Sequence, residues 1–269
     1  MKPLASPAGR TALRSFLRRR PLIALDFDGT LVALRKHPDL VRLSANMLTL
    51  LQQLSTHMPV AVISGRSLKD LRAHIPEKKI LLIGNHGLEG LPFSIALRRS
   101  QRRDNASNVL QIRALLRTLH SCPDCRLENK TFSATLHFPR ESQRGALLRQ
   151  LRRMHWKTAS PPRLMNGRLC INVLPARALN KGSALKTLLT LTERSCAIFI
   201  GDDTTDEDVF ALNDRRILGI TIGRSPSRAS FALPSQRAVP QFLQTCLQSA
   251  GRQERTRKPP HRNRNRRVV

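Results

Sequence analysis

Two acidic clusters, far apart in the sequence, constrain this chain more than any other feature. Residues 26–31 read DFDGTL and residues 201–207 read GDDTTDE, and each cluster directly follows an apolar run, at 22–25 or 197–200. Such runs are typical of buried parallel strands, whose carboxyl ends gather the ligands of open α/β sheets. Two strands therefore bring four or five carboxylates to one sheet edge, where their repulsion demands a cation. Carboxylate oxygens suit Mg²⁺, so the pattern predicts a Mg²⁺ site.

The residues around these clusters continue the same alternation of strand and helix. Apolar runs at 59–63 and 80–83 predict two further strands, and apolar residues at helical spacing predict a helix over 44–57. After residue 175 the pattern resumes, with a strand over 217–222 and a last helix over 239–247. Alternation of this kind indicates an α/β domain with a parallel sheet.

The middle of the chain has a different pattern. Residues 107–120 predict an amphipathic helix, whereas residues 131–138 and 169–174 alternate between apolar and polar side chains. Alternation indicates strands with one covered face, as in a small antiparallel sheet backed by helices. The predicted fold class is therefore α/β, a Rossmann-like parallel-sheet core with an inserted smaller α+β cap domain. The expected boundaries are a core formed by residues 20–90 and 176–249 and a cap formed by residues 91–175.

The chain is strongly basic, with 47 Lys and Arg against 18 Asp and Glu and a net charge of +29. This balance raises the possibility of a nucleic-acid partner. Aromatic residues, on which single-stranded bases stack, make up only 4% of the chain, and the arginines are scattered. We interpret residues 1–19 and 250–269 as basic tails, the second disordered. No specific nucleic-acid partner is expected, although a basic nucleic-acid-associated protein remains the alternative from another class.

The lengths of the apolar runs and the number of cysteines both indicate the cellular compartment in which the protein is expected. No apolar stretch approaches the ~18–20 residues of a membrane helix, and no secretory signal is expected. The five cysteines are odd in number and widely spaced, which favours a reducing compartment and hence the cytoplasm. Cys122 and Cys125 have CxxC spacing, but no second pair completes a zinc site. We interpret them as an incidental loop.

The residues at the strand ends fit the chemistry of phosphoryl transfer. Asp26, directly after a strand, can attack phosphorus and form an aspartyl-phosphate, while Asp28 can protonate the leaving oxygen and later activate water. Ser64 can donate to a phosphoryl oxygen, and Lys181 can neutralise both the nucleophile and the transferring group. The predicted metal site comprises Asp26, Asp28, Asp202 and Asp203, in which Asp203, like Asp206, has a supporting position.

These motifs together resemble the haloacid-dehalogenase superfamily of phosphatases. Finer motifs over residues 20–248 are similar to those of the trehalose-6-phosphate phosphatases. They are HPD at 37–39, ISGRS at 63–67, GNHG at 84–87, LENK at 127–130, LHF at 136–138 and GDDTTDEDVF at 201–210. The resemblance implies a Mg²⁺-dependent hydrolysis of trehalose 6-phosphate to trehalose and phosphate, functionally coupled to a trehalose-6-phosphate synthase.

The resemblance also implies that the cap closes over the sugar. The substrate-binding residues that it implies are Gly65, Arg66, Asn85, His86, Glu128, Lys130 and His137. From spacing alone, residues 128–130 equally fit a surface ion pair on a cap strand. One departure concerns residues 172–175, which read NVLP where the family usually has an E-x-K-P pattern. A phosphatase of another glycosyl phosphate, such as sucrose phosphate or a glycosyl-phosphoglycerate, therefore remains an alternative.

Overall fold

A parallel sheet forms the core of the computed structural model, which describes residues 1–34, 41–92, 95–118, 122–167, 169–223 and 226–257. Within these residues the sheet has seven strands in the order β1-β11-β10-β9-β2-β3-β4, and every neighbouring pair is parallel. The strands are β1 Lys2–Pro3, β2 Leu22–Leu25, β3 Val60–Ile63, β4 Ile80–Ile83, β9 Ala197–Gly201, β10 Ile217–Ile222 and β11 Phe231–Leu233. The predicted apolar runs thus become adjacent buried strands.

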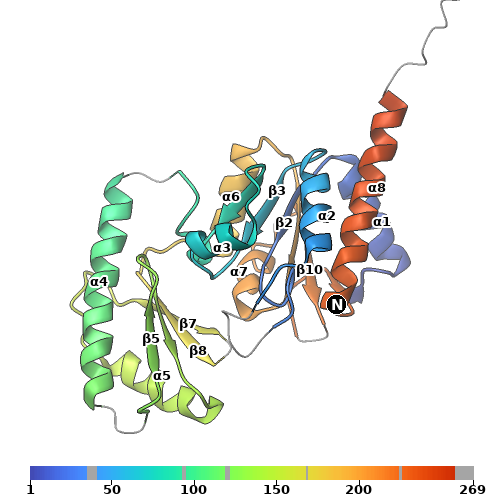
Figure 1. Ribbon diagram of the computed structural model, residues 1–269. Coiled ribbons are helices and arrows are strands. Elements are labelled where there is room, and N and C mark those ends of the chain that lie inside the picture. The colour runs from blue at the N-terminus through green and yellow to red at the C-terminus, as the bar shows by residue number, and fades with distance from the viewer. Residues whose placement is uncertain (35–40, 93–94, 119–121, 168, 224–225, 258–269) are drawn as a thin grey trace, which may run out of the picture.

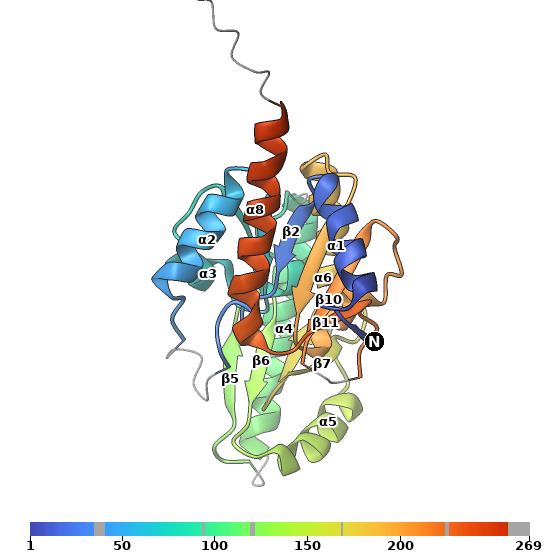
Figure 2. The ribbon, with the colours of Figure 1, turned by 90° about the vertical axis from the view of Figure 1, so that its right-hand side faces the viewer.

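Helices cover both faces of this sheet, because alternate side chains of each strand point to opposite faces. On β2, Ile23 and Leu25 pack in the same cluster as α1, α2, α3 and α8, whereas Leu22 and Ala24 pack in the cluster of α6 and α7. Figure 2 shows α1, α2 and α8 together on one side. The helices are α1 Pro7–Arg18, α2 Ala45–Ser55, α3 Leu68–His74, α6 Lys181–Leu191, α7 Glu207–Phe210 and α8 Val239–Arg257.

The cap is a separate two-layer unit, seen beside the core in Figure 1. Its four strands pair antiparallel in the order β5-β6-β8-β7, and α4 and α5 pack on one face. The elements are α4 Ile95–Thr118, β5 Arg126–Asn129, β6 Ala134–His137, α5 Arg144–Arg153, β7 Arg163–Gly167 and β8 Cys170–Leu174. The predicted fold class, a parallel α/β core with an inserted α+β cap, is confirmed.

The amino-terminal segment contradicts the predicted basic tail at 1–19. Residues Lys2 and Pro3 pair with β11 at the sheet edge, and α1 begins after Ser6, whose hydroxyl caps the helix. Leu13 and Leu17, four residues apart, are buried against the core. The prediction was wrong because the arginines were given more weight than the helical spacing of these apolar residues. Arginines on the solvent face are compatible with a packed amphipathic helix.

The carboxyl-terminal tail was predicted to begin too early. The last helix, α8, continues to Arg257 instead of ending near residue 247. Ala250 is buried, and the amide of Gln253 donates to the carbonyl of Leu17 at 3.1 Å. Residues 250–257 therefore belong to the helix that packs beside α1, and residues 258–269 lie outside the described part of the chain. So does the HPD motif at 37–39.

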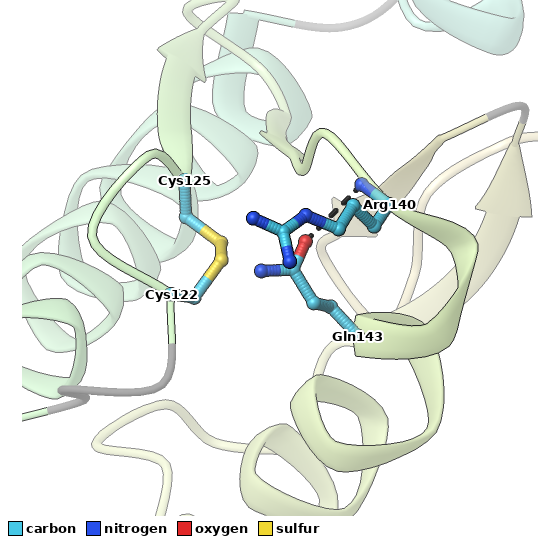
Figure 3. Close-up of a disulfide and its surroundings, with 4 residues drawn as sticks. All are labelled: Cys122, Cys125, Arg140 and Gln143. Atoms are coloured by element: carbon cyan, nitrogen blue, oxygen red, sulfur yellow. Dashed lines mark hydrogen bonds between the residues drawn. A yellow bond between two sulfur atoms is a disulfide. The ribbon is translucent and has the colours of Figure 1, made fainter.

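Cys122 and Cys125 form a disulfide at the start of the chain segment that enters β5, so the prediction of an incidental loop was wrong. Figure 3 shows this bond with Arg140 and Gln143 extending toward it from the neighbouring segment. The Arg140 backbone N–H donates to the Gln143 side chain at 3.2 Å. Cys122 is itself buried in the cap core. Spacing alone could not show that the two thiols face each other.

No helix in the described part of the chain is long and apolar enough to cross a membrane. This observation agrees with the absence of long apolar runs in the sequence.

Candidate active site

Three carboxylates meet at the carboxyl end of the central strands. Asp26 follows β2 and Asp202 follows β9, and these strands are parallel neighbours. The Asp26 backbone N–H donates to the carbonyl of Ile200 at 2.8 Å, which extends the ladder to the acidic residue itself. One carboxylate oxygen from each of Asp26, Asp202 and Asp206 lies within 4.8 Å of the others. The backbone of the sheet thus fixes the position of the predicted nucleophile.

Lys181 is the cation of this cluster. It occupies the first position of α6, is 1% exposed, and donates from Nζ to Asp26 Oδ1 at 2.6 Å and to Asp206 Oδ1 at 2.7 Å. Burial alone would lower the pKa of Lys181, but the carboxylates of Asp206 and Asp26 raise it above its usual value. The ammonium group is therefore charged and bridges the two acids.

The single lysine leaves the acids incompletely neutralised. Burial raises the pKa of Asp26 well above its usual value, against the lowering effect of Lys181, and Asp206 and Asp202 raise it further. Burial, followed by Asp206, raises the pKa of Asp202 to about 7. Carboxylates whose charge is disfavoured in this way gain most from an added cation. The oxygen-only donor set fits Mg²⁺, which prefers hard ligands.

Asp28 and Asp203, two of the predicted metal residues, lie outside the cluster. The Asp28 carboxylate accepts two hydrogen bonds from Arg66, from Nε at 2.7 Å and from Nη2 at 2.8 Å. Asp203 is exposed and accepts from the backbone N–H of Thr204 at 2.7 Å. In the structure Asp206 is therefore the third member of the cluster. The spacing of Asp203 and Asp206, typical of a capping box, was the signal available in the sequence.

A glycine and a threonine hold Asp202 in place. Gly29 has a positive φ of 82°, and a Cβ atom there would collide with the Asp202 carboxylate. Glycine is required here because of the positive φ and because a Cβ atom would not fit beside Asp202. The Thr30 hydroxyl donates to Asp202 Oδ1 at 3.2 Å. These two residues of the DFDGTL motif were not among the predicted site residues, although their proximity to Asp202 connects the two acidic clusters directly.

Ser64 and Gly65 lie at the end of β3, next to the acidic cluster in the sheet. Ser64 is buried, and its Oγ accepts from the backbone N–H of Arg66 at 3.2 Å. Gly65 leaves room for the ring of His86, whose Cε1 would lie 2.6 Å from a Cβ at this position. Arg66 is also bonded to Asp70 at 2.6 Å, so its guanidinium group joins two carboxylates.

Asn85 and His86 form the boundary between core and cap. Both have positive φ angles, 53° and 58°, in the left-handed region that Asn and His tolerate better than most residues. Asn85 donates to the carbonyl of Lys130 at 3.0 Å and accepts from the hydroxyl of Ser133. His86 is 4% exposed, and neither of its ring nitrogens makes a well-formed hydrogen bond, although the Asn172 side chain is near enough to act on the pKa of the ring. Burial, and then the charges of Lys130, Lys181 and Arg163, place the pKa of His86 well below its usual value.

The predicted cap residues form a connected group that faces the core. His137 Nε2 lies 2.8 Å from Glu128 Oε2, and Lys130 Nζ lies 3.8 Å from the same oxygen. Lys130 Nζ also donates to the carbonyl of Gly65 at 3.1 Å, across the boundary between the domains. Although burial acts in the opposite direction, His137 and Lys130 lower the pKa of Glu128. The ion pair at 128–130 is therefore present, but Lys130 extends it to the core.

Cross-strand pairs add residues that sequence analysis did not include. Glu128 is opposite Thr135 in the ladder, and Thr135 is opposite Asn172. The Thr135 hydroxyl donates to Asn172 Oδ1 at 2.8 Å, and both side chains are buried. A further tie between the domains runs from the hydroxyl of Thr204 to the carbonyl of Asn166 at 3.2 Å. These contacts depend on strand register, which the sequence does not specify directly.

The sequence of this chain matches the model of the trehalose-phosphatase family over residues 24–236. The chain belongs to this family. The predicted family and the predicted class of enzyme, a phosphatase, are thereby confirmed. The match includes both acidic clusters, the strand-end residues 64–66, the cap residues and Lys181.

A curated relative supports this assignment, and solved structures show the same fold. The probable trehalose-phosphate phosphatase H of Arabidopsis thaliana is 30% identical over 248 residues, which cover 83% of this chain and 71% of the relative. The C-terminal domain of the C. albicans trehalose-6-phosphate phosphatase has the same fold, with a TM-score of 0.76, 22% identity, and coverage of 92% of this chain and 98% of that domain. A trehalose-6-phosphate phosphatase related protein superposes with a TM-score of 0.68 at 24% identity, covering 87% and 99% of the two chains.

Proposed function

We propose that the chain hydrolyses trehalose 6-phosphate to trehalose and inorganic phosphate, with Asp26 as the nucleophile. The observation that carries this proposal is the buried contact of Asp26 with Lys181, beside Asp202 and Asp206 and at the end of the central strand. In the first step an Asp26 oxygen attacks phosphorus, the ester P–O bond breaks, and the leaving sugar oxygen takes a proton. In the second step water attacks the aspartyl-phosphate, releasing phosphate and restoring the carboxylate.

Asp28 is the proposed proton donor in the first step and the base in the second. Because its carboxylate is bonded to Arg66 at 2.7 Å and 2.8 Å, the reaction requires that it exchange this partner for the ester oxygen. Ser64 and Lys181 are proposed to bind the phosphoryl oxygens as negative charge develops on them. Arg66 and Gly65, at the end of the same strand as Ser64, are proposed to contact the substrate beside the phosphoryl group.

Mg²⁺ is the proposed cofactor, held by Asp26 and Asp202 with Asp206 beside them. The oxygen donors of these residues lie within 4.8 Å of one another, and their charge is only partly neutralised by Lys181. The predicted contributions of Asp28, through its backbone carbonyl, and of Asp203 stay proposals. When bound, the ion supplies positive charge to the phosphoryl oxygens.

Sugar recognition is proposed to lie with Glu128, Lys130 and His137 of the cap and with Asn85 and His86 of the core. The contacts of Lys130 with Gly65 and of Asn85 with Lys130 bring these groups to one boundary. Their mixed donors and acceptors suit a sugar rich in hydroxyl groups. Cytoplasmic location and functional coupling to a trehalose-6-phosphate synthase are further proposals, and no specific nucleic-acid partner is proposed.

The direct test is a phosphate-release screen across sugar phosphates, with Mg²⁺ present and after its removal by EDTA. The screen includes trehalose 6-phosphate, sucrose phosphate, a glycosyl-phosphoglycerate and p-nitrophenyl phosphate. Trehalose 6-phosphate should give the highest kcat/KM, and activity should return when Mg²⁺ is restored. A clear preference for another glycosyl phosphate would contradict the substrate but not the phosphatase, and Asn172 would then be the first residue to examine.

Cap variants test which part of the substrate the cap contacts. Glu128→Ala and Lys130→Ala should each lower kcat/KM for trehalose 6-phosphate roughly ten- to hundredfold, since a hydrogen bond to a charged group contributes about 1.5–3 kcal/mol. Turnover of p-nitrophenyl phosphate, which has no sugar, should change much less. Equal losses with both substrates would indicate general damage and remove these residues from sugar recognition.

A further inference from the structure

Arg163 lies on the face of the cap sheet that is turned toward the core. On β8, Ile171 and Val173 pack against the cap helices, so Asn172 and Leu174 project from the opposite face. Arg163 is the direct cross-strand partner of Leu174, and residues paired in this way share one face of a sheet. Arg163 therefore stands beside the position where this chain has leucine and the family pattern has a basic residue.

The guanidinium group of Arg163 is only partly used by the protein. Its Nη2 donates to the carbonyl of Leu179 at 3.2 Å, two residues before Lys181. Its Nε is buried and has no hydrogen-bond partner. The charge of Arg163 is close enough to His86 to contribute to the lowered pKa of that ring. A charged group beside the active site thus keeps one donor unpaired.

His86 has the same property on the core side of the boundary. Both ring nitrogens are buried without a well-formed hydrogen bond, and the ring lies against Gly65 and close enough to Asn172 for that side chain to act on its pKa. Buried polar atoms without partners are costly and rare in folded proteins, except where a ligand or an ordered water satisfies them. The unpaired Nε–H of Arg163 and the ring of His86, which offers one donor and one acceptor when neutral, lie on the two sides of one boundary and indicate a ligand rich in hydroxyl groups.

We propose that Arg163 is a specificity-determining residue, which binds sugar oxygens of the substrate together with His86. In this role it supplies, from β7, the positive charge that the chain lacks at Leu174. The proposal rests on the proposed function, because the ligand is taken to be the sugar phosphate. Arg163 lies outside the sequence motifs that resemble those of the family.

An ion pair with Asp208 is the structural alternative. Asp208 Oδ2 is also buried without a partner, and the charge of Arg163 lowers the pKa of Asp208, which burial raises. The structure records no ion pair between these two described residues, however. A merely structural Arg163 would hold the cap against the core through Asp208 or Leu179, and its loss would affect every substrate.

The test compares Arg163→Leu with wild-type protein on trehalose 6-phosphate and on p-nitrophenyl phosphate. The variant should lose about tenfold or more in kcat/KM for the sugar phosphate, mainly through KM, and about twofold or less for the small ester. Arg163→Gln, which can still donate to the Leu179 carbonyl, should show the same selective loss. The exchanged pair Arg163→Leu with Leu174→Lys should recover part of it, a result that a merely structural role would not produce.

Two controls accompany these variants. Arg113→Leu removes a charge from the exposed outer side of α4 and should leave both substrates unaffected. Asp208→Asn should not reproduce the selective loss, and if it does, the tie to Asp208 replaces the proposal. Unchanged kinetics in Arg163→Leu, or equal losses on both substrates, would overturn it as well. Wild-type protein that does not turn over trehalose 6-phosphate would instead contradict the proposed function, so the two failures are distinguishable.

Discussion

The acidic site of the core and the polar face of the cap are positioned in different ways. In the core, the backbone places each group: Asp26 continues the ladder of β2, and Lys181 opens α6. In the cap, side chains place one another through contacts between neighbouring strands, such as those of Glu128 with His137 and of Thr135 with Asn172. A position at a strand end depends on few neighbours, whereas a network of side chains can be rearranged by single substitutions.

The charged side chains of the core site are also more deeply buried than Glu128 of the cap. The side chains of Lys181 and Asp206 are 2% and 0% exposed, so removing either partner leaves a charge without water to solvate it. The side chain of Glu128 is 42% exposed, and its contacts are correspondingly easier to replace. We infer that the reaction is fixed in the core and the sugar is selected in the cap. Asn172 and Leu174, where the chain departs from the family pattern, lie on β8 of the cap.

The largest effect is expected for Asp26→Asn. An amide at this position cannot form the acyl-phosphate, so turnover should fall by roughly 10⁴-fold or more. In contrast to cap variants, the loss should be equal for trehalose 6-phosphate and p-nitrophenyl phosphate, because both need the same nucleophile. The measurement is phosphate release by pure protein, with circular dichroism to verify the fold. Retention of even a few per cent of activity would remove Asp26 from this role.

A smaller effect should distinguish Asp206 from Asp203. Asp206→Asn removes the charge that bonds Lys181 at 2.7 Å, and the loss of such a bond should reduce kcat about ten- to hundredfold. Asp203→Asn keeps a side chain that caps a helix as well as Asp does, so activity should fall by less than about threefold. Steady-state kinetics on both variants makes the comparison. The opposite ranking would show that Asp203, and not Asp206, acts in the metal site.

The contrast between core and cap also explains how much could be predicted from the sequence. Asp26 and Ser64 were found because apolar runs indicate strands and the residues after them meet at one sheet edge, whereas Lys181 was found as a lysine just ahead of a predicted helix. The sequence could not show which of Asp203 and Asp206 belongs to the acidic cluster, because the orientation of their side chains depends on one turn of helix that only the structure shows. The pairing of Thr135 with Asn172 depends on register across strands that are 37 residues apart in sequence.

The amino-terminal segment and the disulfide show two other limits. The segment before residue 20 was predicted to be a tail because its composition is basic, yet Leu13 and Leu17 are buried. Net charge describes the solvent face of a helix and gives no information about its packed face. Cys122 and Cys125 have a spacing that suits a loop, a disulfide or half a metal site, and only their geometry decides between these.

His86, at the boundary between core and cap, gives the smallest predicted effect. Because burial lowers its pKa in the folded protein, the unfolded chain binds more protons than the folded one once pH falls below about 6.5. Stability should therefore decrease toward acid, by up to about 1.4 kcal/mol per pH unit from this group alone. His86→Asn, which tolerates the positive φ of 58°, removes this contribution.

Urea unfolding of wild type and His86→Asn at pH 7.5, 6.5 and 5.5 measures this difference. The acidic residues of the core titrate in both proteins, so their contributions cancel when the two free energies of unfolding are subtracted. The free energy of unfolding of His86→Asn should rise relative to that of wild type only below about pH 6.5. The control His155→Asn, at an exposed position on the cap, should show the same pH dependence as wild type. Parallel curves for wild type and His86→Asn would mean that the ring takes up a proton as readily in the folded protein as in the unfolded chain. His86 would then be a cation at the proposed sugar site below about pH 6.5, and under those conditions the boundary would belong electrostatically with the charged core rather than with the neutral pair of Thr135 and Asn172.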